Sequence, residues 1–291
     1  RINTILSNIL KYRKLFLENL IKYRNRKVRL SFLEVWVGQT CTLKCRDCCH
    51  MIPYIKPSIY DVDSLIEDCR ILFLLCDVDF FSILGGEPFT NPDLYKLIDF
   101  VAESKNIKDG KLITNGTIMP NDMMMNSLRK LNNKLDVRID VYPGRETRAQ
   151  EFYDKLTTAG IRCTLLRHSV FEEMRWKKLS GPNQKIIPCR TSEMIYTECA
   201  LKSCHTLSNG ELTVCPRGIT TKEVYGVEKN PWEHIDIKKI GTGVCAKAKI
   251  ATAISTKVYK DYCRYCMGIA EMNPYSIPPG IQIGSQGEIL Q

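Results

Sequence analysis

Short apolar segments alternate with segments of helical periodicity from about residue 30 to residue 185. Apolar residues recur every three or four positions in 62–73 and in 94–101, which predicts amphipathic helices. Short and often β-branched segments predict buried strands at 33–37, 80–84, 111–114, 135–141 and 162–166. Repeated strand and helix units predict an α/β fold with a parallel sheet covered by helices, in which ligands bind at the carboxyl ends of the strands.

The first 29 residues have a different pattern. The segment from Lys11 to Arg29 contains eight Lys or Arg residues and one acid, Glu18. A basic amphipathic helix of this kind can lie on a membrane or contact a partner, but more often it packs its apolar stripe on the neighbouring domain. We therefore expect a packed helix over residues 1–29. Its apolar residues at helical spacing are Ile2, Ile5, Leu6, Ile9, Phe16, Leu20 and Tyr23.

The composition is that of an ordinary globular protein. Hydrophobic residues make up 44% of the 291 residues and charged residues 25%, and this length suffices for a barrel-sized domain and a smaller one. No segment reaches the roughly eighteen apolar residues of a membrane span and no secretory signal is evident, so we expect a cytoplasmic protein. The net charge of +10 suits an anionic small molecule, although a merely basic surface explains it equally well, and no nucleic-acid partner is predicted.

Three cysteines with the spacing CX3CX2C follow the first predicted strand, at Cys41, Cys45 and Cys48. The chain has 14 cysteines, and spacings such as this one indicate metal binding rather than disulfides. A 4Fe-4S cluster is closed by four thiolates, so three cysteines leave one iron open. The alternative is a zinc knuckle with His50 as the fourth ligand, which leaves the next two motifs unexplained.

Two further motifs lie at the ends of later strands. The sequence reads GGEP at 85–88, directly after the second predicted strand, and TNG at 114–116, at the end of the third. The three motifs in this order resemble those of the radical SAM superfamily. The resemblance implies a partial (β/α)6 barrel, which agrees with the pattern of strands and helices.

The resemblance also implies the cofactors. S-adenosyl-L-methionine (SAM) would bind the open iron of a [4Fe-4S] cluster on the three cysteines. One electron from a flavodoxin- or ferredoxin-type donor would then cleave it to a 5'-deoxyadenosyl radical, which abstracts hydrogen. The residues assigned to SAM in this way are Gly85, Gly86, Glu87, Thr114 and Asn115.

Two positions near these motifs are less settled. Asp140, at the end of the fourth strand, either accepts hydrogen bonds from the ribose of SAM or is a solvated strand-end residue. Asp47 stands where the superfamily usually has an aromatic residue near the adenine. This departure puts adenine packing in doubt and leaves Cys49 and His50 as nearby candidates for altered contacts.

The composition changes after Pro188, and cysteines crowd the last hundred residues. Asn209 and Gly210 form a strong signal for a two-residue hairpin turn. A turn there places Leu207 opposite Leu212 and Cys204 opposite Cys215, so both thiols start at one end of the hairpin. The cysteines that could form a second site are Cys199, Cys204, Cys215, Cys263 and Cys266.

This region resembles the C-terminal SPASM or twitch extensions of radical SAM enzymes. No cysteine follows Cys266, which favours the single-cluster twitch form, as in 2-deoxy-scyllo-inosamine dehydrogenase. Cys215, Cys263 and Cys266 are the firmest candidates for a second auxiliary [4Fe-4S] cluster, and the fourth ligand is either Cys199, from its spacing to Gly210, or Cys204, from the hairpin. A structural zinc site is the alternative. The predicted domains are an N-terminal helix (1–29), a radical SAM barrel (30–188) and a twitch-like domain (189–291).

We expect a radical SAM oxidoreductase or epimerase that acts on a sugar or another small polar substrate. The segments 204–218 and 263–268 resemble parts of radical SAM proteins whose genes lie with genes for polysaccharide and glycosyltransferase functions. The alternatives are modification of a ribosomal peptide and a non-catalytic iron-sulfur or zinc interaction protein. Candidate hydrogen donors are Cys189, Cys199, Cys204 and Cys245, and candidates for the substrate cleft after the fifth strand are Arg167, His168, Glu172, Glu173 and Arg175.

Overall fold

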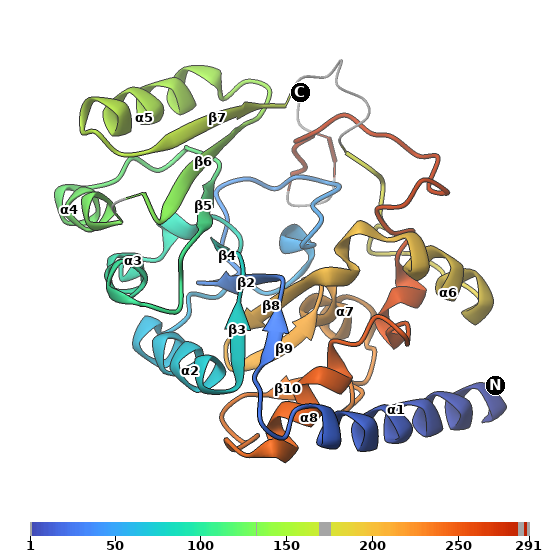
Figure 1. Ribbon diagram of the computed structural model, residues 1–291. Helices are drawn as coiled ribbons and strands as arrows, with labels where there is room; N and C mark the ends of the chain where they lie inside the picture. Colours follow the sequence, from blue (N-terminus) through green and yellow to red (C-terminus); the bar gives the residue numbers. More distant parts are fainter. Residues whose placement is uncertain (1, 132, 169–175, 285–287, 290–291) are drawn as a thin grey trace.

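The computed structural model of the protein describes residues 2–131, 133–168, 176–284 and 288–289. An eight-stranded sheet runs through the molecule in the order β10-β9-β8-β2-β4-β5-β6-β7 (Figure 1). All five predicted strands are present and pair in parallel with their neighbours. They are β2 (Phe32–Trp36), β4 (Phe81–Leu84), β5 (Gly110–Thr114), β6 (Leu135–Val141) and β7 (Cys163–Arg167).

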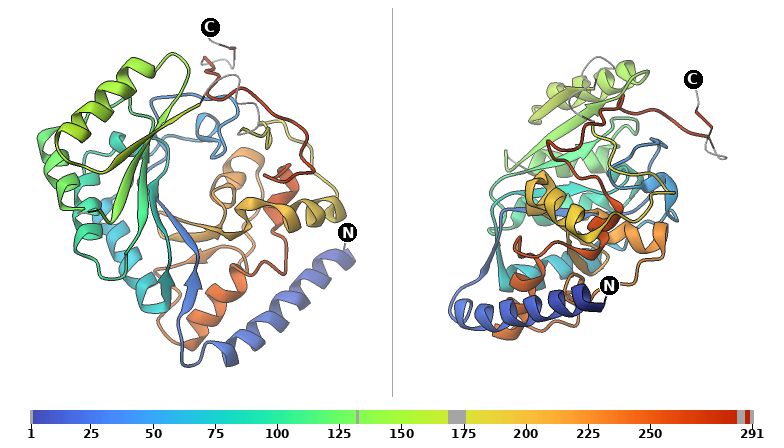
Figure 2. Two further views of the ribbon diagram at one scale, coloured as in Figure 1. Left: turned by 45° about the horizontal axis from the view of Figure 1, so that its top comes forward. Right: turned by 90° about the vertical axis from the view of Figure 1, so that its right-hand side faces the viewer.

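Four helices cover the outer face of these parallel strands, as Figures 1 and 2 show from three directions. Leu65 and Leu72 of α2 and Leu97 of α3 are buried in the core between helices and sheet, as their spacing predicts. The sheet is curved with its helices outside, so the α/β class and the partial barrel are confirmed. The helices are α2 (Val62–Leu75), α3 (Leu94–Glu103), α4 (Asp122–Lys130) and α5 (Glu146–Thr158).

The predicted hairpin is present and extends the same sheet. Strands β8 (Cys204–Ser208) and β9 (Glu211–Val214) pair with Leu207 opposite Leu212, and Cys215 N donates to Cys204 O at 2.6 Å. The turn residues Asn209 and Gly210 both have positive φ, as a two-residue hairpin turn requires. Strand β8 pairs in parallel with β2, so a sixth parallel strand joins the cysteine-rich segment directly to the barrel.

Further short elements surround the hairpin and carry the later cysteines. Strand β10 (Ile235–Asp236) pairs with β9. The same part of the chain forms α6 (Cys189–Glu198), α7 (Arg217–Tyr225), α8 (Val244–Ala253) and the 3-10 turns η3 (Ala200–Ser203) and η4 (Asp261–Tyr265). Two other 3-10 turns, η1 (Ile52–Tyr54) and η2 (Pro88–Thr90), lie in the barrel segment.

The N-terminal helix is shorter than predicted. Helix α1 (Ile2–Lys22) ends seven residues before Arg29, and strand β1 (Val28–Leu30) follows it and pairs with β3 (Cys76–Val78). The predicted bound of 29 is therefore wrong. Val28 and Leu30 are buried while Arg29 is exposed, which is the alternation of a strand and overrides the helical pattern. The helix does pack on the protein as expected, and it lies beside α8 (Figure 1).

Candidate functional site

The three sequence motifs meet in one cavity at the carboxyl ends of the parallel strands. We call it the motif cavity. Cys41, Cys45 and Cys48 line one side of it, on the loop that follows β2. The end of β4, the end of β5 and the end of β6 supply the other side, through Gly85, Gly86, Thr114, Asn115 and Asp140. The structure therefore brings together these predicted residues, with Glu87 behind them.

The two glycines of GGEP let the end of β4 lie against the cysteine loop. A Cβ atom on Gly86 would come within 2.1 Å of the carbonyl oxygen of Thr40, and one on Gly85, whose φ is +138°, within 2.5 Å of Gly38 O. Only glycine allows this approach. Gly86 N donates to Gly38 O at 3.1 Å, which fixes the loop just before Cys41.

Glu87 connects two of the motifs instead of lining the motif cavity. Its buried carboxylate accepts hydrogen bonds from Thr114 Oγ1 at 2.7 Å, Asn115 N at 2.7 Å and Phe89 N at 3.1 Å. Burial raises the pKa of Glu87 to about 7, against the opposing effect of these donors. The residue thus holds the TNG turn against β4, and its predicted contact with SAM stays a prediction.

Amide side chains approach two of the cysteine sulfurs. Asn115 Nδ2 lies 3.7 Å from Cys41 Sγ, and Gln282 Nε2 lies 3.3 Å from Cys45 Sγ. Gln282 belongs to a C-terminal segment that pairs with the cysteine loop, since Arg46 N donates to Ile281 O at 2.8 Å. The last part of the chain therefore helps to hold the first cysteine motif.

Asp140 is buried beside a cation and an aromatic group. Arg138 Nη2 donates to Asp140 Oδ2 at 3.0 Å, and His168 Nε2 lies 3.7 Å from the same oxygen. Tyr142 stacks on His168 with ring centroids 5.1 Å apart, and Trp176 packs against both rings. Asp140 is thus a buried, paired group of the motif cavity and not a solvated strand-end residue.

Asp47 does not line the motif cavity, and its carboxylate pairs with Arg46 Nε at 2.7 Å. Its neighbours Cys49 and His50 line the cavity instead. The ring of His50 lies 5.0 Å from that of Trp36 and is bound to Gly85 O at 3.0 Å. The two residues suggested as substitutes for the missing aromatic side chain are therefore in position to contact a ligand.

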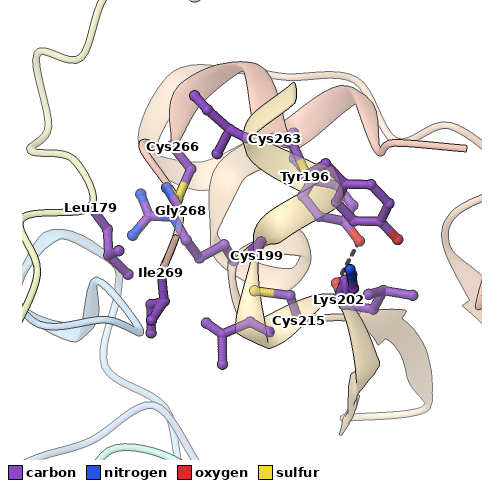
Figure 3. Close-up of a pocket in the computed structure, with 14 residues that line it drawn as sticks. Leu179, Tyr196, Cys199, Lys202, Cys215, Cys263, Cys266, Gly268 and Ile269 are labelled. Atoms are coloured by element: carbon purple, nitrogen blue, oxygen red, sulfur yellow. Dashed lines mark hydrogen bonds between the residues drawn. The ribbon is translucent and has the colours of Figure 1, made fainter. Parts of the chain in front are cut away.

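Four of the later cysteines line a second, smaller pocket, which we call the cysteine pocket. Cys199 follows α6, Cys215 follows β9, and Cys263 and Cys266 lie in and after η4 (Figure 3). Cys215 has a φ of +70°, a left-handed conformation that is rare outside glycine and occurs at functional sites. At Gly268 a Cβ atom would meet Ile195 at 2.6 Å, so glycine permits the close approach of this wall.

Cys204 lies outside the set of residues that line the cysteine pocket. Its buried thiol donates to Glu34 Oε2 at 3.9 Å. The backbones of the two hairpin cysteines are joined by the hydrogen bond from Cys215 N to Cys204 O, as expected at one end of the hairpin, but only the side chain of Cys215 lines the cysteine pocket. Of the two alternatives for a fourth residue, the structure therefore places Cys199 with the other three.

The remaining candidates are scattered. Cys245 is exposed on α8, and Cys189 begins α6. Arg167 Nη2 donates to Gln150 on the surface, whereas His168 is buried beside the motif cavity. The other candidates for the substrate cleft, Glu172, Glu173 and Arg175, lie outside the described residues. Among the described residues, no three His, Cys, Asp or Glu side chains are arranged to bind a single metal ion, and no helix could cross a membrane.

Curated relatives match only part of the chain. The GTP 3',8-cyclase of Syntrophomonas wolfei is 26% identical over 112 residues, which cover 37% of this chain and 34% of that protein. The GTP 3',8-cyclase of Campylobacter lari is 29% identical over 112 residues, or 37% of this chain and 35% of that protein. The matched stretch thus spans about a third of the length of these relatives. No protein-family model matches the chain.

A solved structure matches nearly the whole chain. The structure of BtrN in complex with AdoMet and 2-DOIA has a TM-score of 0.53 and 15% sequence identity, and the likeness covers 90% of this chain and 98% of BtrN. BtrN is a radical SAM enzyme, and the three motifs stand here at the strand ends of the same fold. In its fold and in the stretch that matches the curated relatives, the chain is similar to radical SAM enzymes. Its motif cavity therefore corresponds to the end of the sheet at which this superfamily places its motifs.

The buried thiols of both pockets suit a positively charged metal centre. Burial raises the pKa of Cys41 and Cys45 to about 12, and it also raises the pKa of Cys215 and Cys263. Such thiols stay neutral unless bound iron stabilises their thiolates. The three thiols of the CX3CX2C motif in one cavity and the four thiols in the other therefore fit an open and a closed cluster, respectively.

Sequence reasoning missed two buried charged residues near the two pockets. Glu34 interrupts the apolar strand β2, accepts a hydrogen bond from Trp36 Nε1 and lies 3.8 Å from His50 Nε2. Arg217 is only 3% exposed and lines the cysteine pocket. The available signals were the charge of Glu34 inside an apolar strand and the position of Arg217 two residues after the candidate ligand Cys215.

Arg217 has no acidic partner among the described residues. Its guanidinium donates to Cys49 O at 3.2 Å and to Ser180 Oγ, and it contacts Met51 Sδ at 3.0 Å. A buried and unpaired cation is costly, so its presence calls for a nearby negative charge. A cluster bound by four thiolates would carry such a charge in the cysteine pocket that Arg217 lines.

Proposed function

We propose that the protein is a radical SAM oxidoreductase or epimerase with two [4Fe-4S] clusters. Cys41, Cys45 and Cys48 would hold the cluster that binds SAM. The ligands of the second, auxiliary cluster would be Cys199, Cys215, Cys263 and Cys266. The observation that carries this proposal is that the three cysteines of the CX3CX2C motif, with their neighbour Cys49, line one pocket and that four of the later cysteines line another. We leave Cys204 out of the second set because its thiol donates to Glu34 Oε2.

When bound, the first cluster and SAM supply reductive cleavage to a 5'-deoxyadenosyl radical, which abstracts hydrogen from the substrate. The residues of this chain position the cofactor. Gly85 and Gly86 keep the strand end close to the cysteine loop, and Glu87 acts as a positioning residue because it holds Thr114 and Asn115. Asp140, held by Arg138, is the candidate for the ribose hydroxyl groups.

The substrate that we propose is a sugar or another small polar molecule. BtrN, whose fold the chain shares, was solved with 2-DOIA, and the partial relatives are named for GTP. The motif cavity carries the polar groups Arg138, Asp140 and His50 next to the aromatic Tyr142 and Trp176, which suits a ligand with several hydroxyl or charged groups. We further propose a flavodoxin- or ferredoxin-type electron donor and a cytoplasmic location.

Iron analysis of anaerobically reconstituted protein tests the proposed cofactors. Wild-type protein should contain roughly eight irons, and a Cys41→Ala/Cys45→Ala/Cys48→Ala variant about four, without formation of 5'-deoxyadenosine. The matched control is Cys245→Ala, an exposed cysteine outside both pockets, which should leave the iron content unchanged. If reduced wild-type protein neither binds SAM nor forms 5'-deoxyadenosine, the proposal is wrong. Zinc found in place of iron would support a structural zinc site.

Incubation with candidate substrates in deuterated water tests the type of reaction. Deuterium at a stereocentre of the product indicates epimerisation, whereas a mass lower by about two units indicates dehydrogenation. Sugars and nucleotide-linked sugars are the first candidates because they follow from the proposed substrate class. If the protein converts a peptide and none of the sugars tested, the carbohydrate proposal is wrong and peptide modification takes its place.

A further inference from the structure

The outward face of α1 carries a row of large aliphatic side chains. Leu10 is 61% exposed, Leu17 is 62% exposed and Ile21 is 83% exposed. Residues separated by seven and four positions lie on one side of an α-helix, so the three form a continuous row. Single exposed aliphatic residues are ordinary on protein surfaces, but a row along one helix marks an interaction surface.

The opposite face of α1 is anchored to the protein. Tyr12 donates to Glu233 Oε1 at 2.9 Å in a buried contact and stacks on Trp232 with ring centroids 6.0 Å apart. Asn19 Nδ2 donates to Thr252 Oγ1 at 3.1 Å. Rotation of the helix would break all of these contacts, so the aliphatic row stays directed outward. Helix α1 lies at the edge of the molecule in all three views (Figures 1 and 2), where this face is accessible.

Positive charges border the aliphatic row. Lys14 lies within it by helical spacing, Arg13 lies on one flank, and Arg24 follows two residues after the end of the helix. All three are exposed, and none forms an ion pair within the part of the chain that the structure describes. The acid of the helix, Glu18, is outnumbered by these cations. The outward face is therefore both apolar and positively charged.

We propose that α1 docks the protein on an anionic membrane surface. Leu10, Leu17 and Ile21 would enter the boundary between headgroups and acyl chains, and Arg13, Lys14 and Arg24 would contact lipid phosphates. A second copy of the chain is a poorer occupant, because it would place these cations against each other. Binding would be peripheral, since no described helix could cross a membrane. This surface is separate from both cysteine pockets, so the proposal does not depend on the proposed chemistry.

Vesicle flotation of the full-length reconstituted protein tests the proposal. Vesicles of phosphatidylcholine with a quarter phosphatidylglycerol should bind wild-type protein at least tenfold better than pure phosphatidylcholine vesicles, and added salt should weaken the binding. The variant Leu10→Gln/Leu17→Gln/Ile21→Gln should lose about tenfold or more, although it keeps every charge. The variant Arg13→Gln/Lys14→Gln/Arg24→Gln should lose the preference for anionic vesicles.

A matched control uses exposed aliphatic residues elsewhere on the surface. Leu74→Gln/Met123→Gln/Met194→Gln removes side chains that are 62%, 50% and 54% exposed, and it should bind vesicles as the wild type does. Circular dichroism confirms that each variant is folded. Equal binding by the wild type and the α1 aliphatic variant overturns the proposal. The proposal is also overturned if the wild type binds no vesicles but sediments as a dimer and the α1 aliphatic variant sediments as a monomer. That result would assign the row to self-association.

Discussion

Arg217 Nη1 donates a hydrogen bond to the carbonyl oxygen of Cys49 at 3.2 Å. Cys49 directly follows Cys48 of the first cysteine motif, whereas Arg217 itself lines the cysteine pocket. One buried guanidinium therefore contacts the loop of one proposed cluster and the walls of the other. Since no acidic side chain among the described residues neutralises it, its charge is available to both.

Replacement of Arg217 should change the reduction potential of the second cluster. A nearby cation favours the more negative, reduced state, so Arg217→Met should lower the midpoint potential by about 60 mV, or about 1.4 kcal/mol for one electron. Arg217→Lys keeps the charge and should retain most of the wild-type potential. Redox titration followed by electron paramagnetic resonance measures both variants. Equal potentials in the wild type and Arg217→Met would rule out this role.

Two serine variants distinguish the ligand candidates of the cysteine pocket. Cys199→Ser should reduce the iron content by about four and weaken the signal of the second cluster, because Cys199 shares the pocket with three other cysteines. Cys204→Ser should retain the full iron content, because the Cys204 thiol is directed to Glu34. Iron and sulfide counting on both variants gives the answer, and loss of iron only in Cys204→Ser would reverse the assignment.

Glu87→Gln should destabilise the protein and weaken SAM binding. The carboxylate accepts from Thr114 on one oxygen and from the Asn115 N–H on the other, and a carboxamide can accept on only one side. The buried donor left unpaired should lower the free energy of unfolding by about 1–3 kcal/mol. Chemical denaturation measures the stability and equilibrium dialysis the SAM affinity. Unchanged values for both would show that Glu87 does not position the TNG turn.

Gln282→Ala should loosen the first cysteine motif. Gln282 accepts a hydrogen bond from Lys44 N at 2.8 Å and donates to Cys45 Sγ at 3.3 Å, so its removal frees the loop and exposes one thiolate. We expect a chelator to extract iron from the first cluster several-fold faster than in the wild type. The control is Gln150→Ala on the exposed face of α5, which should match the wild type. An unchanged extraction rate in Gln282→Ala would contradict the role of the C-terminal segment.

Much of the architecture follows from local sequence pattern. Each predicted strand of the barrel segment is present, because short apolar, β-branched segments between amphipathic helices can be buried in few other ways. The register of the hairpin also follows from the local sequence. Asn209 and Gly210 form the turn, and a two-residue turn there pairs Leu207 with Leu212. The meeting of the CX3CX2C, GGEP and TNG motifs is likewise expected, because the carboxyl ends of parallel strands share one edge.

The end of the N-terminal helix did not follow from the sequence. Its basic and apolar residues continue past Lys22, yet Val28 and Leu30 gain more by pairing with β3 than by extending the helix. The aliphatic row Leu10, Leu17 and Ile21 was also not identified, because which side of an amphipathic helix faces the protein depends on what it packs against. Here the anchors are Tyr12 and Asn19.

The sequence by itself determined the resemblance to radical SAM enzymes, the strand order along the chain and the residue types of both cysteine sites. Only the tertiary structure decided which side chains converge. Cys199 lines the cysteine pocket with Cys215 and Cys204 does not, because packing of α6 brings Cys199 to the pocket while the Cys204 thiol donates to Glu34. Gln282 reaches Cys45 across 237 positions of sequence, and Arg217 lies between two sites that the sequence shows only as separate motifs. Such contacts depend on the packing of distant segments, which periodicity and spacing do not encode.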